Sequence, residues 1–220
     1  REYDIRGLAE QDFDKEFALL LGKVHGTSVV EAGGSRVAVG RDCRATSDPY
    51  AEAVIAGMIS AGLQVYDIGV CPTPLLYFSL FHLDLDGGIQ ITASHNPSEY
   101  NGFKICRGKD TLYGQQIQEI RACMERSEFR AKSGGVRKQY DIMSPYRRHL
   151  LADVPQLARP LKIVIDAGSG VGGPVAPPIF RQLGCEVFEI ACVPDGRFPI
   201  HHPDPTVPEN LEMLIEKVRS

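Results

Sequence analysis

Residues 87–105 read GGIQITASHNPSEYNGFKI. A short apolar run, Gly88–Ile91, enters a polar turn, and a second short run, Gly102–Ile105, leaves it. Such runs bounded by turn residues are typical of buried strands, so the sequence predicts two strands joined as a hairpin. The turn and its exit hold the side chains that can carry chemistry: Ser94, His95, Asn96 and Lys104. A nucleophile, a phosphate carrier and a plain polar loop are the alternatives.

Strands and helices are predicted to alternate through the chain before this stretch. Short apolar runs at residues 36–39 and 64–68 are bounded by Gly or Asp, as buried strands are. Apolar residues at helical spacing fill the segments between the strands. In the first of these helices, Asp48 fits the N-cap and Gly62 the C-terminal stop. The alternation predicts a three-layer α/β/α fold with a mixed, mostly parallel sheet.

The same pattern restarts after a polar, glycine-bearing stretch at residues 131–141, which is typical of a linker. Strands are expected at residues 161–166 and 185–190, with a helix between them and a last helix at residues 211–218. We therefore predict two sequential domains of one type, residues 1–140 and 141–220. The second copy is expected to be truncated, because about 80 residues are few for a complete α/β core.

The composition argues against several classes of partner. With 24 Lys and Arg against 28 Asp and Glu, the formal net charge is −4, so no basic surface for nucleic acid is expected. No apolar run approaches the roughly 20 residues that a membrane span needs. The six cysteines are scattered without a CxxC pair, which favours free thiols and a cytoplasmic protein. The oligomeric state is not indicated.

Ser94 does not fit the nucleophile of a typical hydrolase. Its neighbours are Ala93 and His95, whereas the nucleophile elbow G-x-S-x-G requires glycines. In an extended segment, adjacent side chains point to opposite sides, so Ser94 and His95 are expected to diverge. An Asn-Pro turn whose hydroxyl bonds locally remains an alternative.

Three cationic residues favour a phosphate site instead. Lys104 lies across the predicted hairpin from Ser94, where its ammonium group could approach a phosphate. Arg6 and Arg41 lie in strand-end segments, YDIRG and VGRD. Because the strand-end loops of a parallel sheet meet at one edge, we expect both arginines near the same site.

Two other motifs have a functional and a structural interpretation. DAGSGVGG, residues 166–173, fits G-x-G-x-x-G, and Glu189 could bind a ribose, so a dinucleotide-binding domain is one alternative. The interpretation that we favour is a structural turn without nucleotide. In HHPDP, residues 201–205, two histidines and Asp204 could hold a metal, but no third ligand has suitable spacing. We predict a proline-stiffened loop there.

Six segments together resemble one enzyme family. They are REYDIRG, VGRD, CPTP, TASHNPSEYNGFKI, DAGSGVGG and DGRFPIHHPDPTVPENL, in this order along nearly the whole chain. The chain is similar to the α-D-phosphohexomutases, and most of all to the bacterial bifunctional phosphomannomutase/phosphoglucomutase branch. TASHNP followed by NGFKI is the most specific of these matches.

The resemblance implies that Ser94 carries a phosphoryl group. Hexose 1-phosphate and hexose 6-phosphate would interconvert through this phosphoserine and a bisphosphate intermediate, with hexose 1,6-bisphosphate as activator. Mg²⁺ bound at the Ser94 phosphate would neutralise developing charge. The residues that match the family's site fall into two groups. The catalytic group is Ser94, Lys104 as acid–base, His95 and Arg6; the substrate-binding group is Tyr3, Asn96 and Arg41.

The chain also departs from the family's pattern. The metal loop Asp-Gly-Asp-Gly-Asp-Arg is expected after residue 218, whereas the sequence ends at Ser220. The Asp ligands of the Mg²⁺ and the sugar- and phosphate-binding loops of two later domains are therefore missing. We expect a truncated phosphohexomutase portion that is inactive alone. The alternative is a non-catalytic α/β binding module or a dinucleotide-binding domain.

Overall fold

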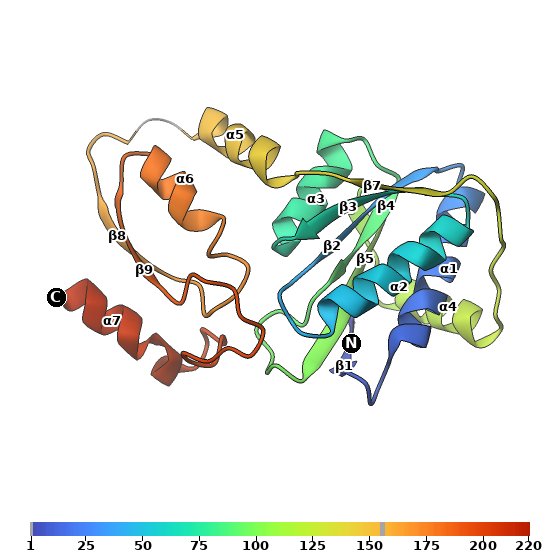
Figure 1. The fold of residues 1–220 in the computed structure, drawn as a ribbon, viewed down its shortest axis with the longest axis horizontal. Coiled ribbons are helices and arrows are strands. Elements are labelled where there is room, and N and C mark those ends of the chain that lie inside the picture. Colours follow the sequence, from blue (N-terminus) through green and yellow to red (C-terminus); the bar gives the residue numbers. More distant parts are fainter. Residues whose placement is uncertain (1, 155–156) are drawn as a thin grey trace.

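The computed structural model describes residues 2–154 and 157–220. The first unit, residues 2–140, is built on a seven-stranded sheet with the order β1-β5-β4-β2-β3-β7, in which β6 pairs with β5 (Figure 1). The strands are β1 Ile5–Leu8, β2 Arg36–Arg41, β3 Gln64–Val70, β4 Gly87–Ile91, β5 Tyr100–Arg107, β6 Asp110–Thr111 and β7 Val136–Gln139.

The pairing of the strands confirms the predicted mixed sheet. The neighbours β4, β2, β3 and β7 run parallel, while β5 is antiparallel to β1, β4 and β6. The predicted hairpin is the β4–β5 pair, and Gln90 on β4 lies opposite Lys104 on β5. The Ser94 turn therefore lies at the carboxyl end of β4, a central strand of the sheet.

Helices cover both faces of this sheet, as the three-layer prediction requires (Figure 1). Successive side chains of β2 point to opposite faces of the sheet. Val37 and Val39 belong to the hydrophobic cluster that α1, α2 and α4 cover, and Ala38 belongs to the cluster that α3 covers. The start of α5 packs on this second cluster through Ile142. The helices are α1 Lys15–Glu31, α2 Ser47–Ser60, α3 Thr73–His82, α4 Gln115–Glu125 and α5 Met143–Asp153.

The predicted N-cap of α2 was wrong. The helix starts at Ser47 with Thr46 as N-cap residue, so Asp48 lies inside the first turn. Its carboxylate accepts a hydrogen bond from Arg41 instead of capping the helix. The predicted stop is confirmed, because Gly62 follows the last turn with φ 89°, a conformation that glycine adopts without strain.

The predicted linker at residues 131–141 contains a strand. β7 pairs in parallel with β3 although all four of its residues are exposed. Its sequence, VRKQ, has no apolar alternation, which is why the pattern did not indicate a strand. What holds it is polar: Arg137 and Gln139 both donate to the carboxylate of Asp67 on β3.

Past α5, residues 157–220 form a second, smaller unit that repeats the strand–helix–strand order. Its sheet has two parallel strands, and α6 and α7 pack against it (Figure 1). The elements are β8 Lys162–Asp166, α6 Ala176–Gln182, β9 Glu186–Ile190, a 3-10 turn Pro208–Leu211 and α7 Glu212–Arg219. Within the described part of the chain, no helix is both long and apolar enough to cross a membrane.

Candidate functional site

The turn between β4 and β5 brings Ser94 and His95 together. Ser94 has φ 59°, and its N–H donates to Thr92 Oγ1 at 3.0 Å. Because this backbone conformation is not extended, the two adjacent side chains do not diverge, and Ser94 Oγ lies 3.3 Å from His95 Nδ1. The expectation that they point apart was therefore wrong. It assumed an extended segment, whereas the chain reverses direction at Ser94.

A buried network connects this turn to the cationic residues on the neighbouring strands. Asp4, which is 5% exposed, accepts hydrogen bonds from Arg6 Nη2 at 2.5 Å and from Lys104 Nζ at 3.0 Å. Arg6 Nη1 donates to Asn96 Oδ1 at 3.1 Å. β1 pairs with β5, which places Arg6 and Lys104 on adjacent strands. Two cations share one carboxylate, so the network carries net positive charge and suits a phosphate.

Asp4 is a site residue that the sequence did not indicate. It lies two residues before Arg6, so in extended chain both side chains point to the same side. That spacing was the available signal. Close pairing of β1 with β5 also depends on Gly102, because a Cβ there would lie 2.4 Å from the Ile5 carbonyl oxygen.

Two of the predicted substrate-binding residues lie apart from this network. The Arg41 guanidinium binds Asp48 and, at 2.9 Å, Asp67, and it makes no hydrogen bond to the Ser94 turn among the described residues. Burial alone would lower the pKa of Arg41, but the two carboxylates outweigh it and raise the pKa above its ordinary value. Tyr3 is 64% exposed and faces solvent. A role for either residue in substrate binding stays a prediction.

Loops of the second unit lie against the Ser94 turn. His95 Nε2 is 4.0 Å from Asp204 Oδ2, in the HHPDP loop. A cavity of about 230 Å³ lies between the two units. Its lining includes Cys43, Thr92, Ser94, Gly170, Val171 and Phe198. DAGSGVGG and HHPDP, the two motifs with both a functional and a structural interpretation, therefore lie beside Ser94.

These two motifs bind each other. His201 Nε2 lies 2.9 Å and 3.0 Å from the two carboxylate oxygens of Asp166, at the start of DAGSGVGG. Burial lowers the pKa of His201, but the His202 carbonyl and the Asp166 carboxylate together raise it above 6.5. Glu189 forms an ion pair with Arg181, and a Cβ on Gly173 would lie 1.9 Å from the Cys192 carbonyl oxygen. These contacts favour the structural interpretation of the glycine-rich turn.

The described side chains do not by themselves form a magnesium site at Ser94. In residues 2–154 and 157–220, no group of three or more His, Cys, Asp or Glu side chains could hold a metal ion. The carboxylates around the turn are already engaged. Asp4 binds Arg6 and Lys104, Asp42 binds Arg44 and Ser47, and Asp204 binds Thr206. Ser94 as a metal ligand stays a prediction.

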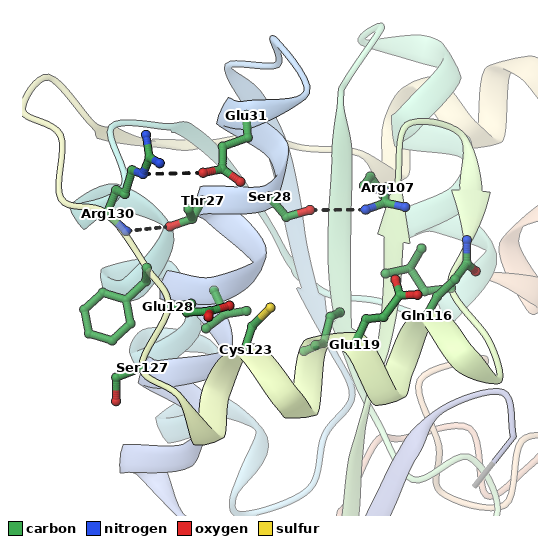
Figure 2. Close-up of a pocket in the computed structure, with 14 residues that line it drawn as sticks. Thr27, Ser28, Glu31, Arg107, Gln116, Glu119, Cys123, Ser127, Glu128 and Arg130 are labelled. Carbon is green, nitrogen blue, oxygen red and sulfur yellow. Dashed lines mark hydrogen bonds and ion pairs between the residues drawn. The ribbon is translucent and has the colours of Figure 1, made fainter.

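A separate cavity of about 440 Å³ lies between α1 and α4 (Figure 2). None of the predicted site residues lines it. The cationic groups at its rim already have partners, since Arg130 pairs with Glu31 at 3.4 Å and Arg107 donates to Ser28 at 3.4 Å (Figure 2). The Ser94 turn remains the candidate site.

Comparison with known proteins gives the same family over both units. Residues 1–131 match the family described as phosphoglucomutase/phosphomannomutase, alpha/beta/alpha domain I, and residues 144–220 match its domain II. A phosphomannomutase/phosphoglucomutase of Pseudomonas aeruginosa is 41% identical over 220 residues, which is all of this chain and 47% of the relative. A phosphoglucomutase of Neisseria meningitidis is 41% identical over 222 residues, covering 48% of its length. The chain thus spans about half the length of the curated relatives that it matches.

Solved structures agree with the sequence matches. A phosphoglucomutase/phosphomannomutase family protein of Burkholderia thailandensis superposes with a TM-score of 0.94 at 40% identity, covering 99% of this chain and 49% of that one. A structure described as a phosphomannomutase of Thermus thermophilus gives a TM-score of 0.84 at 28% identity, covering 99% and 51%.

Proposed function

The chain belongs to the phosphoglucomutase/phosphomannomutase family, and we propose on this basis that Ser94 is the phosphoryl carrier of a phosphohexomutase. The whole protein would interconvert hexose 1-phosphate and hexose 6-phosphate, with glucose and mannose phosphates as substrates. The observation that carries this proposal is the network in which Arg6 and Lys104 share Asp4 and reach the Ser94 turn through Asn96. A phosphoserine carries about −1.5 to −2 charge near pH 7 and needs such cations nearby.

The described side chains have distinct roles in this proposal. The phosphoryl group passes from Ser94 Oγ to the free hydroxyl of the sugar phosphate, so the bond from Oγ to phosphorus breaks and a new O–P bond forms. Lys104 is an ammonium group paired with Asp4 at 3.0 Å in the structure. For this step it first gives a proton to solvent, and its amine then takes the hydroxyl proton and becomes the ammonium group again. His95, at 3.3 Å from Ser94 Oγ, is placed to hydrogen-bond that oxygen. The bisphosphate then returns its other phosphoryl group to Ser94.

Mg²⁺ and a hexose 1,6-bisphosphate activator belong to the same proposal. The phosphate on Ser94 would supply oxygen ligands to the ion, whose positive charge would neutralise the transferring phosphoryl group. Among the described side chains, no group of three or more His, Cys, Asp or Glu could complete such a site. Arg6 is the described cation best placed to face the phosphate, since it already binds Asn96 in the turn.

The test is a variant series in the full-length protein encoded by the gene, assayed for conversion of glucose 1-phosphate and mannose 1-phosphate. We expect Ser94→Ala to abolish turnover, because the phosphoryl carrier is lost. Lys104→Gln should lower kcat about 10²- to 10⁴-fold, the usual contribution of acid–base catalysis. Lys109→Gln is the matched control. Lys109 lies in the turn after the end of β5 that is remote from Ser94, where it binds Asp84, and the variant should retain near wild-type activity. Turnover in Ser94→Ala would contradict the proposal.

A further inference from the structure

Arg44 is a buried cation that the proposed chemistry does not use. Arg44 is 3% exposed and lies in the segment that follows β2. Its guanidinium donates to four backbone carbonyls of the Ser94 turn. Nη2 binds the Ser94 oxygen at 3.1 Å and the Asn96 oxygen at 2.7 Å, and Nη1 binds the oxygens of Pro97 and Tyr100. One side chain thus fixes the backbone of the turn from residue 94 to residue 100.

Arg44 is itself bound by Asp42, whose carboxylate is in turn bound by the first residue of α2. Its Nε donates to Asp42 Oδ2 at 3.0 Å, and its own N–H donates to Asp42 Oδ1 at 3.0 Å. The same Oδ1 accepts from the hydroxyl of Ser47, the first residue of α2, at 2.5 Å. Because these groups are buried, the pair of charges holds a fixed geometry.

The second unit covers this arginine. The Phe198 ring centroid lies 5.0 Å from Arg44 Cζ, within the range of a cation–π contact. Gly196 lies so close to the first unit that a Cβ there would be 2.4 Å from the Cys43 carbonyl oxygen. The loop of residues 195–206 therefore closes over Arg44 as well as facing His95 through Asp204.

We propose that Arg44 is the positioning residue of the phosphoryl-carrying turn, and that Phe198 connects its position to the second unit. This proposal rests on the proposed function, since it gives Ser94 its role. The left-handed conformation of Ser94 costs about 1 kcal/mol or more for a residue with a side chain, so contacts outside the residue must maintain it. A planar guanidinium with five donors can bind several carbonyls at once. An ammonium group cannot span the same set.

The experiment is hydrogen exchange, read by mass spectrometry on the 220-residue chain without substrate. In Arg44→Ala, we expect the peptide covering residues 93–101 to exchange about tenfold faster or more, because its amides lose the fixed turn. Peptides from the centres of β2 and β3 should not change. Guanidinium ion at millimolar concentration should restore protection, because it refills the emptied site. Arg44→Lys keeps the charge and should lose protection at residues 93–101 to the same extent. This variant replaces Arg44→Ala in the test if the alanine variant does not fold.

Arg36→Ala is the matched control. Arg36 also donates to backbone carbonyls, those of Leu83 and Asp84, at the opposite end of β2. Its loss should loosen residues 83–86 and leave the Ser94 turn protected. Unchanged exchange at residues 93–101 in both Arg44 variants, or an equal rise through β2 and β3, would overturn the positioning role.

A second readout separates this proposal from the proposed function. Uptake of a phosphoryl group by Ser94 from hexose 1,6-bisphosphate should be about tenfold slower or more in Arg44→Ala and should recover with guanidinium ion. If Ser94 of the full-length wild-type protein takes up no phosphate, the proposed function fails, whereas the exchange data still decide the role of Arg44 in the turn.

Discussion

His25 on α1 is a residue whose surroundings predict a measurable pH dependence. It is fully buried, and neither ring nitrogen has a hydrogen-bond partner among the described residues. Burial first, and then the nearby charge of Arg107, lower its pKa from 6.5 to about 4. The imidazole therefore stays neutral in the folded protein down to acidic pH.

We predict that His25 destabilises the fold as the pH falls from 6.5 to 4. In this window the unfolded chain takes up a proton that the folded chain does not, so the free energy of unfolding decreases, by about 3 kcal/mol in total. His25→Leu should remove this part of the slope in urea unfolding measured at several pH values. His149→Gln, at an exposed histidine, should keep it. An identical slope in His25→Leu and wild type would contradict the assignment.

Residue by residue, the candidate site was only partly predictable from the sequence. Ser94, Asn96 and Lys104 are close in the chain, so the hairpin pattern was enough to group them. Asp4 and Arg44 were missed because their roles depend on contacts between distant segments. The carboxylate becomes a bridge only when β1 pairs with β5, and the guanidinium meets its carbonyls only when the turn folds over it.

Among the elements, β7 is joined to β3 by one buried carboxylate in addition to its strand pairing. Asp67 on β3 is inaccessible to solvent and binds Arg41 at 2.9 Å, Gln139 at 2.7 Å and Arg137. Burial would raise the pKa of Asp67, but its hydrogen bonds and charge partners outweigh burial and lower it. The carboxylate is therefore ionised and holds the edge strand in place.

Asp67→Ala should lower the free energy of unfolding by about 1–3 kcal/mol, because Arg41, Arg137 and Gln139 lose a buried acceptor, although the two arginines keep Asp48 and Glu52 as partners. Urea unfolding measures this loss, and hydrogen exchange should show that β7 loses protection first. Asp84→Asn is the control, since Asp84 forms an exposed pair with Lys109 and its loss should cost at most about 1 kcal/mol. A loss of stability no larger than that of the control would show that other contacts hold β7.

The elements show which sequence patterns are reliable. Strands at residues 36–39, 64–68 and 88–91 were predictable because they are buried and flanked by turn residues. β1 and β7 were not, because their stability comes from pairing and ion pairs rather than from apolar periodicity. The structure assigns residues 136–139 of the predicted linker to the first sheet.

For the whole molecule, the distribution of the core predicts unequal stability of the two units. Both hydrophobic clusters lie within residues 13–142. After residue 157, the described residues contribute few buried apolar side chains, namely Val175, Pro177, Ile179 and Cys185. A two-stranded sheet is marginal in stability on its own.

Limited proteolysis with a protease of low specificity should therefore remove the second unit first. The persistent fragment should contain the sheet from β1 to β7 and α5, which packs on this unit, and should end after Asp153, as mass spectrometry would show. This result would also test the predicted boundary between the domains. Degradation of both units at one rate would contradict the expected difference in stability.

Ser94 is tested as the phosphoryl carrier by locating the phosphate that a hexose 1,6-bisphosphate transfers to this chain. With Mg²⁺ present, we expect a single phosphoryl group on the peptide that contains Ser94 and none in Ser94→Ala. Arg6→Ala should slow the uptake, because the cation that faces the phosphate is lost. A phosphate on another residue, or uptake that persists in Ser94→Ala, would contradict the account.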